Sequence, residues 1–115
     1  MTTPQTSPTH QYGNLPVHFQ VHRYRSTNRP CLRLVHAQDG TPVATATVNL
    51  PDEALAPSEV AVKDHSENEG MLEWLWKAGI IERQPTRYVP SGFVRIPICT
   101  LTPAGRLLVG KEPRS

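Results

Sequence analysis

The chain has 115 residues and a formal net charge of +2, and hydrophobic residues make up 37% of it. This length corresponds to one domain, and no apolar run approaches the roughly 18 residues that a membrane span needs, so we expect a cytoplasmic protein that does not contact a membrane. So small a net charge does not indicate a uniformly basic nucleic-acid binder, and seven of the ten acids fall in one block, from Asp39 to Glu69.

Both ends of the chain are polar and lack periodicity. Residues 1–14 show no alternation of apolar and polar side chains, so we expect a disordered N-terminal tail. This tail has neither the basic start nor the apolar core of a signal peptide. Residues 110–115 are expected to fray, which leaves a single domain over residues 15–109.

Three strands are predicted to follow the tail as an antiparallel meander. Residues 17–21 and 43–50 alternate apolar and polar side chains, which is the period of a half-buried strand. The strand predicted over residues 31–37 places Leu32 and Leu34 on one face and Arg33 and Val35 on the other. Between the second and third of these strands along the chain, Asp39 and Gly40 supply the positive φ angles that a tight hairpin turn requires. Consecutive strands joined in this way predict a meander.

An acidic loop and the main helix are predicted next. Residues 51–64 are expected to form a proline-bracketed acidic loop and then a short fourth strand. The helix is predicted over residues 66–78. Ser66 and Glu69 have the spacing of a capping box, and Gly79 lies where helices commonly end.

The predicted helix is amphipathic. Met71, Leu75 and Trp76 lie on its apolar arc when the residues are plotted at the helical period. Trp76 is therefore predicted to be the tryptophan of the core. Trp74 falls at the margin of the arc and is expected to be partly exposed.

The remaining chain is predicted to add two strands and one helical turn. Residues 90–92, Pro-Ser-Gly, are typical of a hairpin turn. Pro97 has no amide hydrogen for a sheet ladder, so the last strand is expected to lie at a sheet edge or to end in a bulge at this residue. Thr102 and Pro103 are typical of an N-cap and the first helical position. These elements predict an α+β domain in which an antiparallel sheet of five or six strands packs against one main helix, 66–78.

The residue types that could support catalysis or metal binding have structural explanations. His18 and His22 would stand about 13 Å apart on one strand face, which is too far for one ion. Residues 64–66 read Asp-His-Ser, but a catalytic triad is assembled by the fold and not by neighbours in sequence. Cys31 and Cys99 have no C-x-x-C spacing and are expected to be buried, reduced thiols. We therefore expect no enzymatic activity, no metal ion and no cofactor.

Part of the C-terminal half resembles the end of a winged-helix regulator. Residues Leu75–Arg83 and Leu101–Arg106 are similar to the recognition helix and the last helix of that family, with a turn between them. This resemblance implies DNA binding, for which Arg83, Arg87 and Arg95 are the candidate contacts. The strands predicted upstream depart from the family, which has two helices there, and the acids at the start of the helix would repel phosphate.

A second resemblance covers roughly residues 41–101. The segments Thr47–Pro51, Val60–Leu72 and Val89–Cys99 resemble a family of small uncharacterised bacterial proteins carried on plasmids, phages and other mobile elements. No catalytic residues can be carried over from this family. The resemblance implies an accessory function on mobile DNA, such as inhibition of a host defence system of the anti-restriction or anti-CRISPR type.

The predicted function is therefore that of a non-enzymatic protein that binds a host or defence-system protein. A partly exposed tryptophan flanked by acids suits such an interface. The predicted contact residues are Asp52, Glu53, Glu59, Glu67 and Trp74. A second copy of the chain, forming a homodimer, is another possible partner, because the predicted edge strand that contains Pro97 is incompletely protected against pairing. A winged-helix-like DNA-binding regulator is the alternative function.

Overall fold

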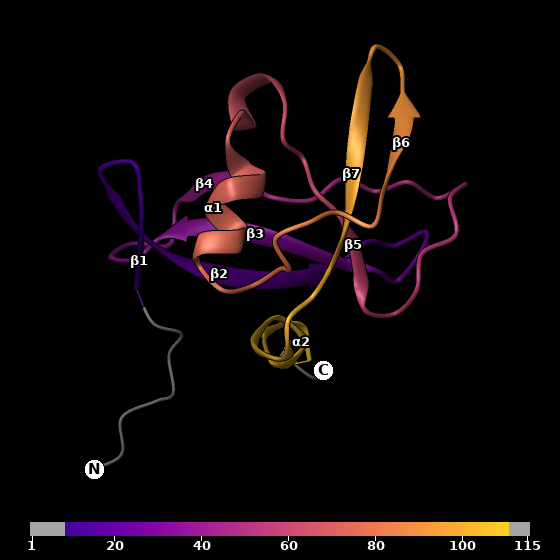
Figure 1. The fold of residues 1–115 in the computed structure, drawn as a ribbon. Coiled ribbons are helices and arrows are strands. Elements are labelled where there is room, and N and C mark those ends of the chain that lie inside the picture. The colour runs from indigo at the N-terminus through magenta and orange to yellow at the C-terminus, as the bar shows by residue number, and fades with distance from the viewer. Residues whose placement is uncertain (1–8, 111–115) are drawn as a thin grey trace.

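The computed structural model describes residues 9–110, which form two antiparallel sheets and two short helices (Figure 1). The first sheet is a meander in the order β1-β2-β3-β4. Its strands are β1 (His10–Tyr12), β2 (Leu15–Arg23), β3 (Pro30–His36) and β4 (Pro42–Thr45). Alternate side chains of β2 are buried, and Phe19 lies opposite Leu34 of β3. The predicted alternation therefore sets the buried face of this sheet.

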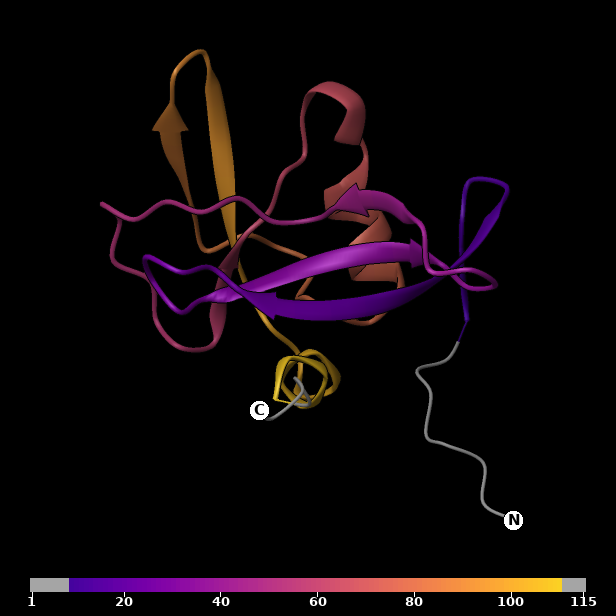
Figure 2. The ribbon, with the colours of Figure 1, turned by 180° about the vertical axis from the view of Figure 1, so that it is seen from behind.

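The second sheet has three strands in the order β5-β7-β6. They are β5 (Glu59–Ala61), β6 (Arg87–Ser91) and β7 (Val94–Thr100). The two sheets meet at a single bridge between Thr47 and Val62, which lie just beyond β4 and β5. The β6–β7 hairpin extends past this junction and projects from the rest of the molecule (Figure 2).

Two short helices complete the fold. A 3₁₀ turn, η1 (Ser66–Asn68), precedes α1 (Met71–Lys77), and α2 (Pro103–Val109) follows β7. Figures 1 and 2 show α1 lying across one face of the first sheet, with α2 beyond the end of β7 that is opposite to the hairpin turn. The hydroxyl of Thr102 accepts a hydrogen bond from the Gly105 amide, which confirms the predicted cap of this last helix.

Two apolar clusters form the interior. The larger one lies between the first sheet, α1 and the segment that enters α2; its fully buried members include Val17, Leu32, Leu34, Met71, Leu75, Ile81 and Leu101. The smaller cluster lies on the other face of the second sheet, where Ile96 and Ile98 are buried together with Ala61. The second sheet therefore carries apolar side chains on both faces, and its hairpin reaches beyond both clusters.

The α+β class is confirmed, but the predicted arrangement of one sheet with one main helix is corrected. Residues 9–110 form seven strands in two sheets, and the two α-helices of this range contain seven residues each. The predicted strands over residues 43–50 and 59–64 are shorter, because each leaves its ladder after three or four residues to form the bridge between sheets. Alternation in sequence gave no signal for this change of sheet.

The predicted capping box at the start of the helix is wrong. Ser66 has a positive φ of 56° and lies in η1, and α1 begins only at Met71, after Gly70. The amide of Leu72 in the first turn is instead satisfied by the carboxylate of Asp64, at 2.9 Å. A carboxylate two residues upstream of the predicted cap therefore stabilises the start of the helix.

The prediction that Pro97 marks an edge strand is also wrong, because β7 is the central strand of its sheet. Proline is tolerated there since the β5 ladder stops beside it. The last pair of that ladder joins Ala61 to Ile98. At the next position the Val62 amide donates to the Pro97 carbonyl at 3.0 Å, and the return bond that proline cannot make falls outside the ladder.

Two further predictions are corrected in part. Residues 10–12 lie within the expected tail but form β1, which pairs with β2. The expected disorder of residues 1–8 and fraying of residues 111–115 concern residues outside the described range. Trp76 was predicted to be a core residue, yet it is half-buried, as is Trp74. Met71 and Leu75 are the residues of α1 that are fully buried.

Candidate interaction surfaces

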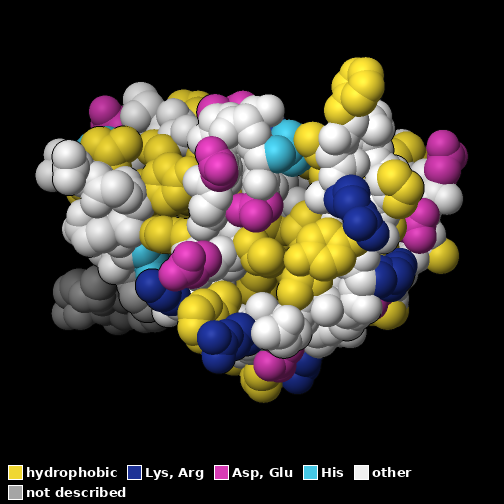
Figure 3. All heavy atoms as spheres, turned by 45° about the horizontal axis from the view of Figure 1, so that its top comes forward, with side chains coloured by type: hydrophobic (Ala, Val, Ile, Leu, Met, Phe, Trp, Pro, Cys, Tyr) yellow, Lys and Arg dark blue, Asp and Glu magenta, His cyan; other side chains and the backbone are white. Residues whose placement is uncertain are grey.

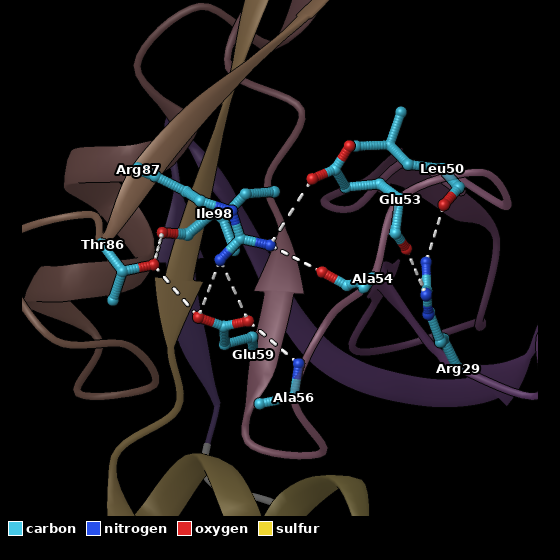
Figure 4. A network of polar contacts seen from close by, with 9 residues as sticks. All are labelled: Arg29, Leu50, Glu53, Ala54, Ala56, Glu59, Thr86, Arg87 and Ile98. Atoms are coloured by element: carbon cyan, nitrogen blue, oxygen red, sulfur yellow. Dashed lines mark hydrogen bonds and ion pairs between the residues drawn. The ribbon is translucent and has the colours of Figure 1, made fainter.

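The acidic loop predicted as a contact surface is fixed to the second sheet by an ion-pair network (Figure 4). Oε2 of Glu59 lies 3.2 Å from Nη1 of Arg87. The Glu59 carboxylate also accepts hydrogen bonds from the Ala56 amide (2.9 Å) and the Thr86 hydroxyl (3.1 Å). Arg87 continues to the Ala54 carbonyl at 2.6 Å. The Glu59 side chain is only 13% exposed, so little of it is accessible to a partner.

These contacts hold the pKa of the Glu59 carboxyl below its usual value. The hydrogen bond from the Ala56 amide makes the largest contribution, and Thr86 and Arg87 act in the same direction, whereas partial burial opposes them. Hydrogen bonds and opposite charge favour the ionised form of a carboxyl group. The ion pair with Arg87 is therefore formed at neutral pH.

A second arginine holds the other end of the acidic loop (Figure 4). Arg29 donates hydrogen bonds to the carbonyls of Leu50 (2.7 Å) and Glu53 (2.5 Å). The Glu53 carboxylate lies 3.7 Å from Arg87, whereas Asp52 is exposed. Two of the three predicted contact acids of this loop therefore face arginines of the protein itself.

The other two predicted contact residues are also engaged within the chain. Glu67 lies 2.6 Å from Nζ of Lys63, and the hydrogen bond from that lysine lowers the pKa of the Glu67 carboxyl. The indole N–H of Trp74 donates to the Gln11 carbonyl at 2.8 Å, and its ring packs against Phe19. Four of the five predicted residues thus have intramolecular partners, Glu53 and Glu59 sharing Arg87, and only Asp52 is described by its exposure alone.

A different surface carries aromatic side chains and arginines together. Phe93 is fully exposed between the ends of the two hairpin strands, and Tyr88 of β6 is 47% exposed. The guanidinium of Arg95 lies 5.8 Å from the Tyr88 ring centroid, and that of Arg83 lies 4.8 Å from the Trp76 ring centroid. We call these five residues, Trp76, Arg83, Tyr88, Phe93 and Arg95, the hairpin surface.

Figure 3 shows hydrophobic side chains gathered at the centre of the face beside the projecting hairpin, with Lys or Arg side chains next to them. Sequence reasoning singled out the two exposed arginines but missed Tyr88 and Phe93. Phe93 directly follows the predicted turn at residues 90–92. The turn alone would therefore have predicted that Phe93 lies at the tip of the hairpin. The exposure of Tyr88 could not be predicted, because the alternation of apolar and polar residues does not show which face of a strand another element covers.

The described residues offer shallow grooves and no cluster suited to metal binding. One groove of about 300 Å³ is lined by His10, Trp74 and Lys77, and another of about 290 Å³ lies between the Arg29 turn and the acidic loop. Within residues 9–110, no three His, Cys, Asp or Glu side chains gather as a ligand set. No helix in this part of the chain is long and apolar enough to cross a membrane.

Both cysteines are free and buried. Burial raises the pKa of the Cys99 thiol to about 12, and the nearby charge of Asp64 acts in the same direction. The nucleophilic form of cysteine is the thiolate. Cys99 is therefore a protonated, apolar packing residue at neutral pH.

No protein-family model, curated protein or solved structure matches this chain. The resemblance to a winged-helix domain meets a structural difficulty, because residues 9–65 form strands and no helix. The two upstream helices of that family are thus absent from this range.

Proposed function

We propose that this protein is a non-enzymatic binding protein that contacts a partner protein through the tip of its β6–β7 hairpin. The observation that carries the proposal is the complete exposure of Phe93 on a projecting hairpin. Burial of a phenylalanine side chain is worth roughly 1.5–3 kcal/mol, so an exposed one is well suited to fill a pocket of a partner. Tyrosine and arginine are enriched at binding hot spots, and the same hairpin carries Tyr88 with Arg95 against its ring.

The proposed context is mobile DNA. It rests on the resemblance of residues 41–101 to proteins carried on plasmids and phages. A host defence protein of the restriction or CRISPR type is accordingly the proposed target, and the cytoplasm is the proposed location. The exposed Asp52 extends the same hypothesis to the acidic loop, as a peripheral contact outside the hairpin tip.

A pull-down from host cells with the tagged protein tests the hairpin tip. We expect a protein retained by the unmodified chain to be lost with Phe93→Ala. Leu107→Ala provides the matched control, because Leu107 is 67% exposed on α2 and lies outside the hairpin surface. Equal retention by both variants, or no specific retention by any of the three proteins, would contradict the proposal.

A further inference from the structure

Arg83 and Arg95 differ from Arg87 in their electrostatic surroundings. Arg87 is engaged by Glu59, whereas the other two arginines are exposed and contact aromatic rings. Within residues 9–110, neither Arg83 nor Arg95 has a carboxylate within ion-pair distance. Their positive charges are thus available to an anionic ligand.

The aromatic contacts also prepare these arginines for binding. A guanidinium held against a ring is attracted by the negative face of the π-system. It has therefore already lost part of its rotamer freedom, which lowers the entropic cost of placing it against a ligand. The rings of Tyr88 and Phe93 remain exposed beside Arg95.

The side chains of Tyr88 and Arg95 lie on the face of the hairpin that turns toward α1. In the hairpin register Arg95 lies opposite Pro90, and the side chains of Tyr88, Pro90 and Arg95 alternate onto the same sheet face as Cys99. Cys99 belongs to the cluster that contains Leu75 of α1. This face of the hairpin therefore turns toward α1, the helix that carries Trp76.

We propose that the hairpin surface binds single-stranded nucleic acid, by stacking bases on its exposed rings and by contacting phosphates through Arg83 and Arg95. Aromatic platforms beside a few basic groups are the common means of binding unpaired bases without sequence preference. This inference does not depend on a protein partner at Phe93, since its charge contacts come from the two arginines.

The same geometry disfavours a duplex as the ligand. Stacking on side chains requires bases that are already unpaired. The hairpin surface carries only two positive charges, those of Arg83 and Arg95. The exposed Glu82 next to Arg83 reduces its positive potential further. With seven residues, α1 is about 10 Å long and offers little for a major groove to accommodate.

Fluorescence anisotropy with labelled oligothymidylate at low salt tests the proposal. The oligonucleotide should exceed the roughly 4–16 nucleotides that a single-strand-binding domain covers. We expect saturable binding that is weaker for a duplex of the same length. With two phosphate contacts on a single strand, the plot of log K against log salt concentration should have a slope of about −1.4. Parallel titrations with oligouridylate distinguish DNA from RNA as the preferred source of the strand.

Two variants and one control separate stacking from general charge. Tyr88→Ala should weaken binding about 5- to 150-fold, as expected for the loss of one stacked base. Arg95→Glu should weaken it and make the salt slope shallower. Arg25→Glu changes the net charge equally at an exposed turn residue outside the hairpin surface and should leave affinity nearly unchanged. Circular dichroism melting of each variant confirms folding, because all three side chains are exposed.

Three outcomes would overturn this inference. One is the absence of oligonucleotide binding at low salt while a protein partner is still captured through Phe93, which would assign the surface to protein alone. Another is binding that Tyr88→Ala leaves intact. The third is an equal loss of affinity in Arg95→Glu and Arg25→Glu, which would show nonspecific attraction to the whole chain.

Discussion

Glu59 of β5 and Arg87 of β6 lie on the two outer strands of the second sheet, and their side chains meet across β7 with 3.2 Å between Oε2 and Nη1. From the sequence, Glu59 is predicted to contact a protein partner, and Arg87 is a candidate contact for nucleic acid. In the structure each is the other's ion-pair partner, and together they hold the acidic loop against the sheet (Figure 4). Mutation of either residue is therefore expected to affect stability first.

Replacement of Glu59 by alanine should destabilise the protein by about 1–3 kcal/mol. The change removes the acceptor of the Ala56 amide and of Nη1 of Arg87, and the loss of hydrogen bonds to a charged group costs roughly this amount. Urea unfolding of the variant and the unmodified protein measures the difference. Asp52→Ala, at an exposed acid of the same loop, serves as the control and should stay within about 0.5 kcal/mol. Equal effects of the two changes would contradict a structural role for Glu59.

The same carboxylate predicts a pH dependence. The pKa of Glu59 is lower in the folded protein than its ordinary value of 4.5, so the unfolded chain binds the proton more readily. The stability that this group contributes is therefore present above pH 4.5 and is lost as the pH falls through the folded pKa. Unfolding titrations at several pH values should show a shallower acid-side loss for Glu59→Gln than for the unmodified protein. Parallel profiles would refute this assignment.

The start of α1 distinguishes two capping arrangements. Asp64 accepts the Leu72 amide at 2.9 Å, whereas Ser66 makes no side-chain cap bond at η1 or α1. Asp64→Ala should therefore cost about 0.5–2 kcal/mol, and Ser66→Ala should change the free energy of unfolding by no more than about 0.5 kcal/mol. Thermal or urea unfolding measures both. A larger effect at Ser66 than at Asp64 would favour the capping box after all.

These positions show which features local sequence can predict. The strands around Phe19 and Leu34, the turn at Gly40 and the cap at Thr102 depend on neighbours in sequence, and they were predicted correctly. The change of sheet at Thr47 depends on a partner fifteen residues away, at Val62, and alternation does not encode it.

The candidate site follows the same rule. The resemblance to a winged-helix regulator singled out Arg83, Arg87 and Arg95, and turn composition predicted the hairpin at residues 90–92. Whether an individual charge is free depends on tertiary partners, as the pairing of Arg87 with Glu59 shows. The sequence therefore identifies the residue types of a binding surface. It does not show which of these residues remain accessible, because tertiary contacts decide that.

Gly105 allows α2 to approach the end of the α1 segment closely. A Cβ at this position would lie 2.1 Å from the carbonyl oxygen of Ile80, which is backbone and cannot move aside by a rotamer change. Gly105→Ala should therefore destabilise the protein by about 1–3 kcal/mol or more, despite the higher helix propensity of alanine. Ala104→Gly, at an exposed neighbour, should cost only about 1 kcal/mol. Calorimetric melting compares the two, and a stabilised Gly105→Ala would show that this contact is not maintained.

The proposed anti-defence function predicts a phenotype that depends on Phe93. In a host with an active restriction system, expression of this protein should raise transformation by an unmodified plasmid relative to a protected one. Loss of the Phe93 side chain should weaken the partner complex about 10- to 150-fold, which is the equivalent of burying one phenylalanine, and should abolish the effect. Leu107→Ala should retain it, since Leu107 is exposed on α2. The same variants in a CRISPR interference assay separate the two defence types, and unchanged transformation in both hosts would reject defence inhibition while leaving protein binding to be judged by the pull-down.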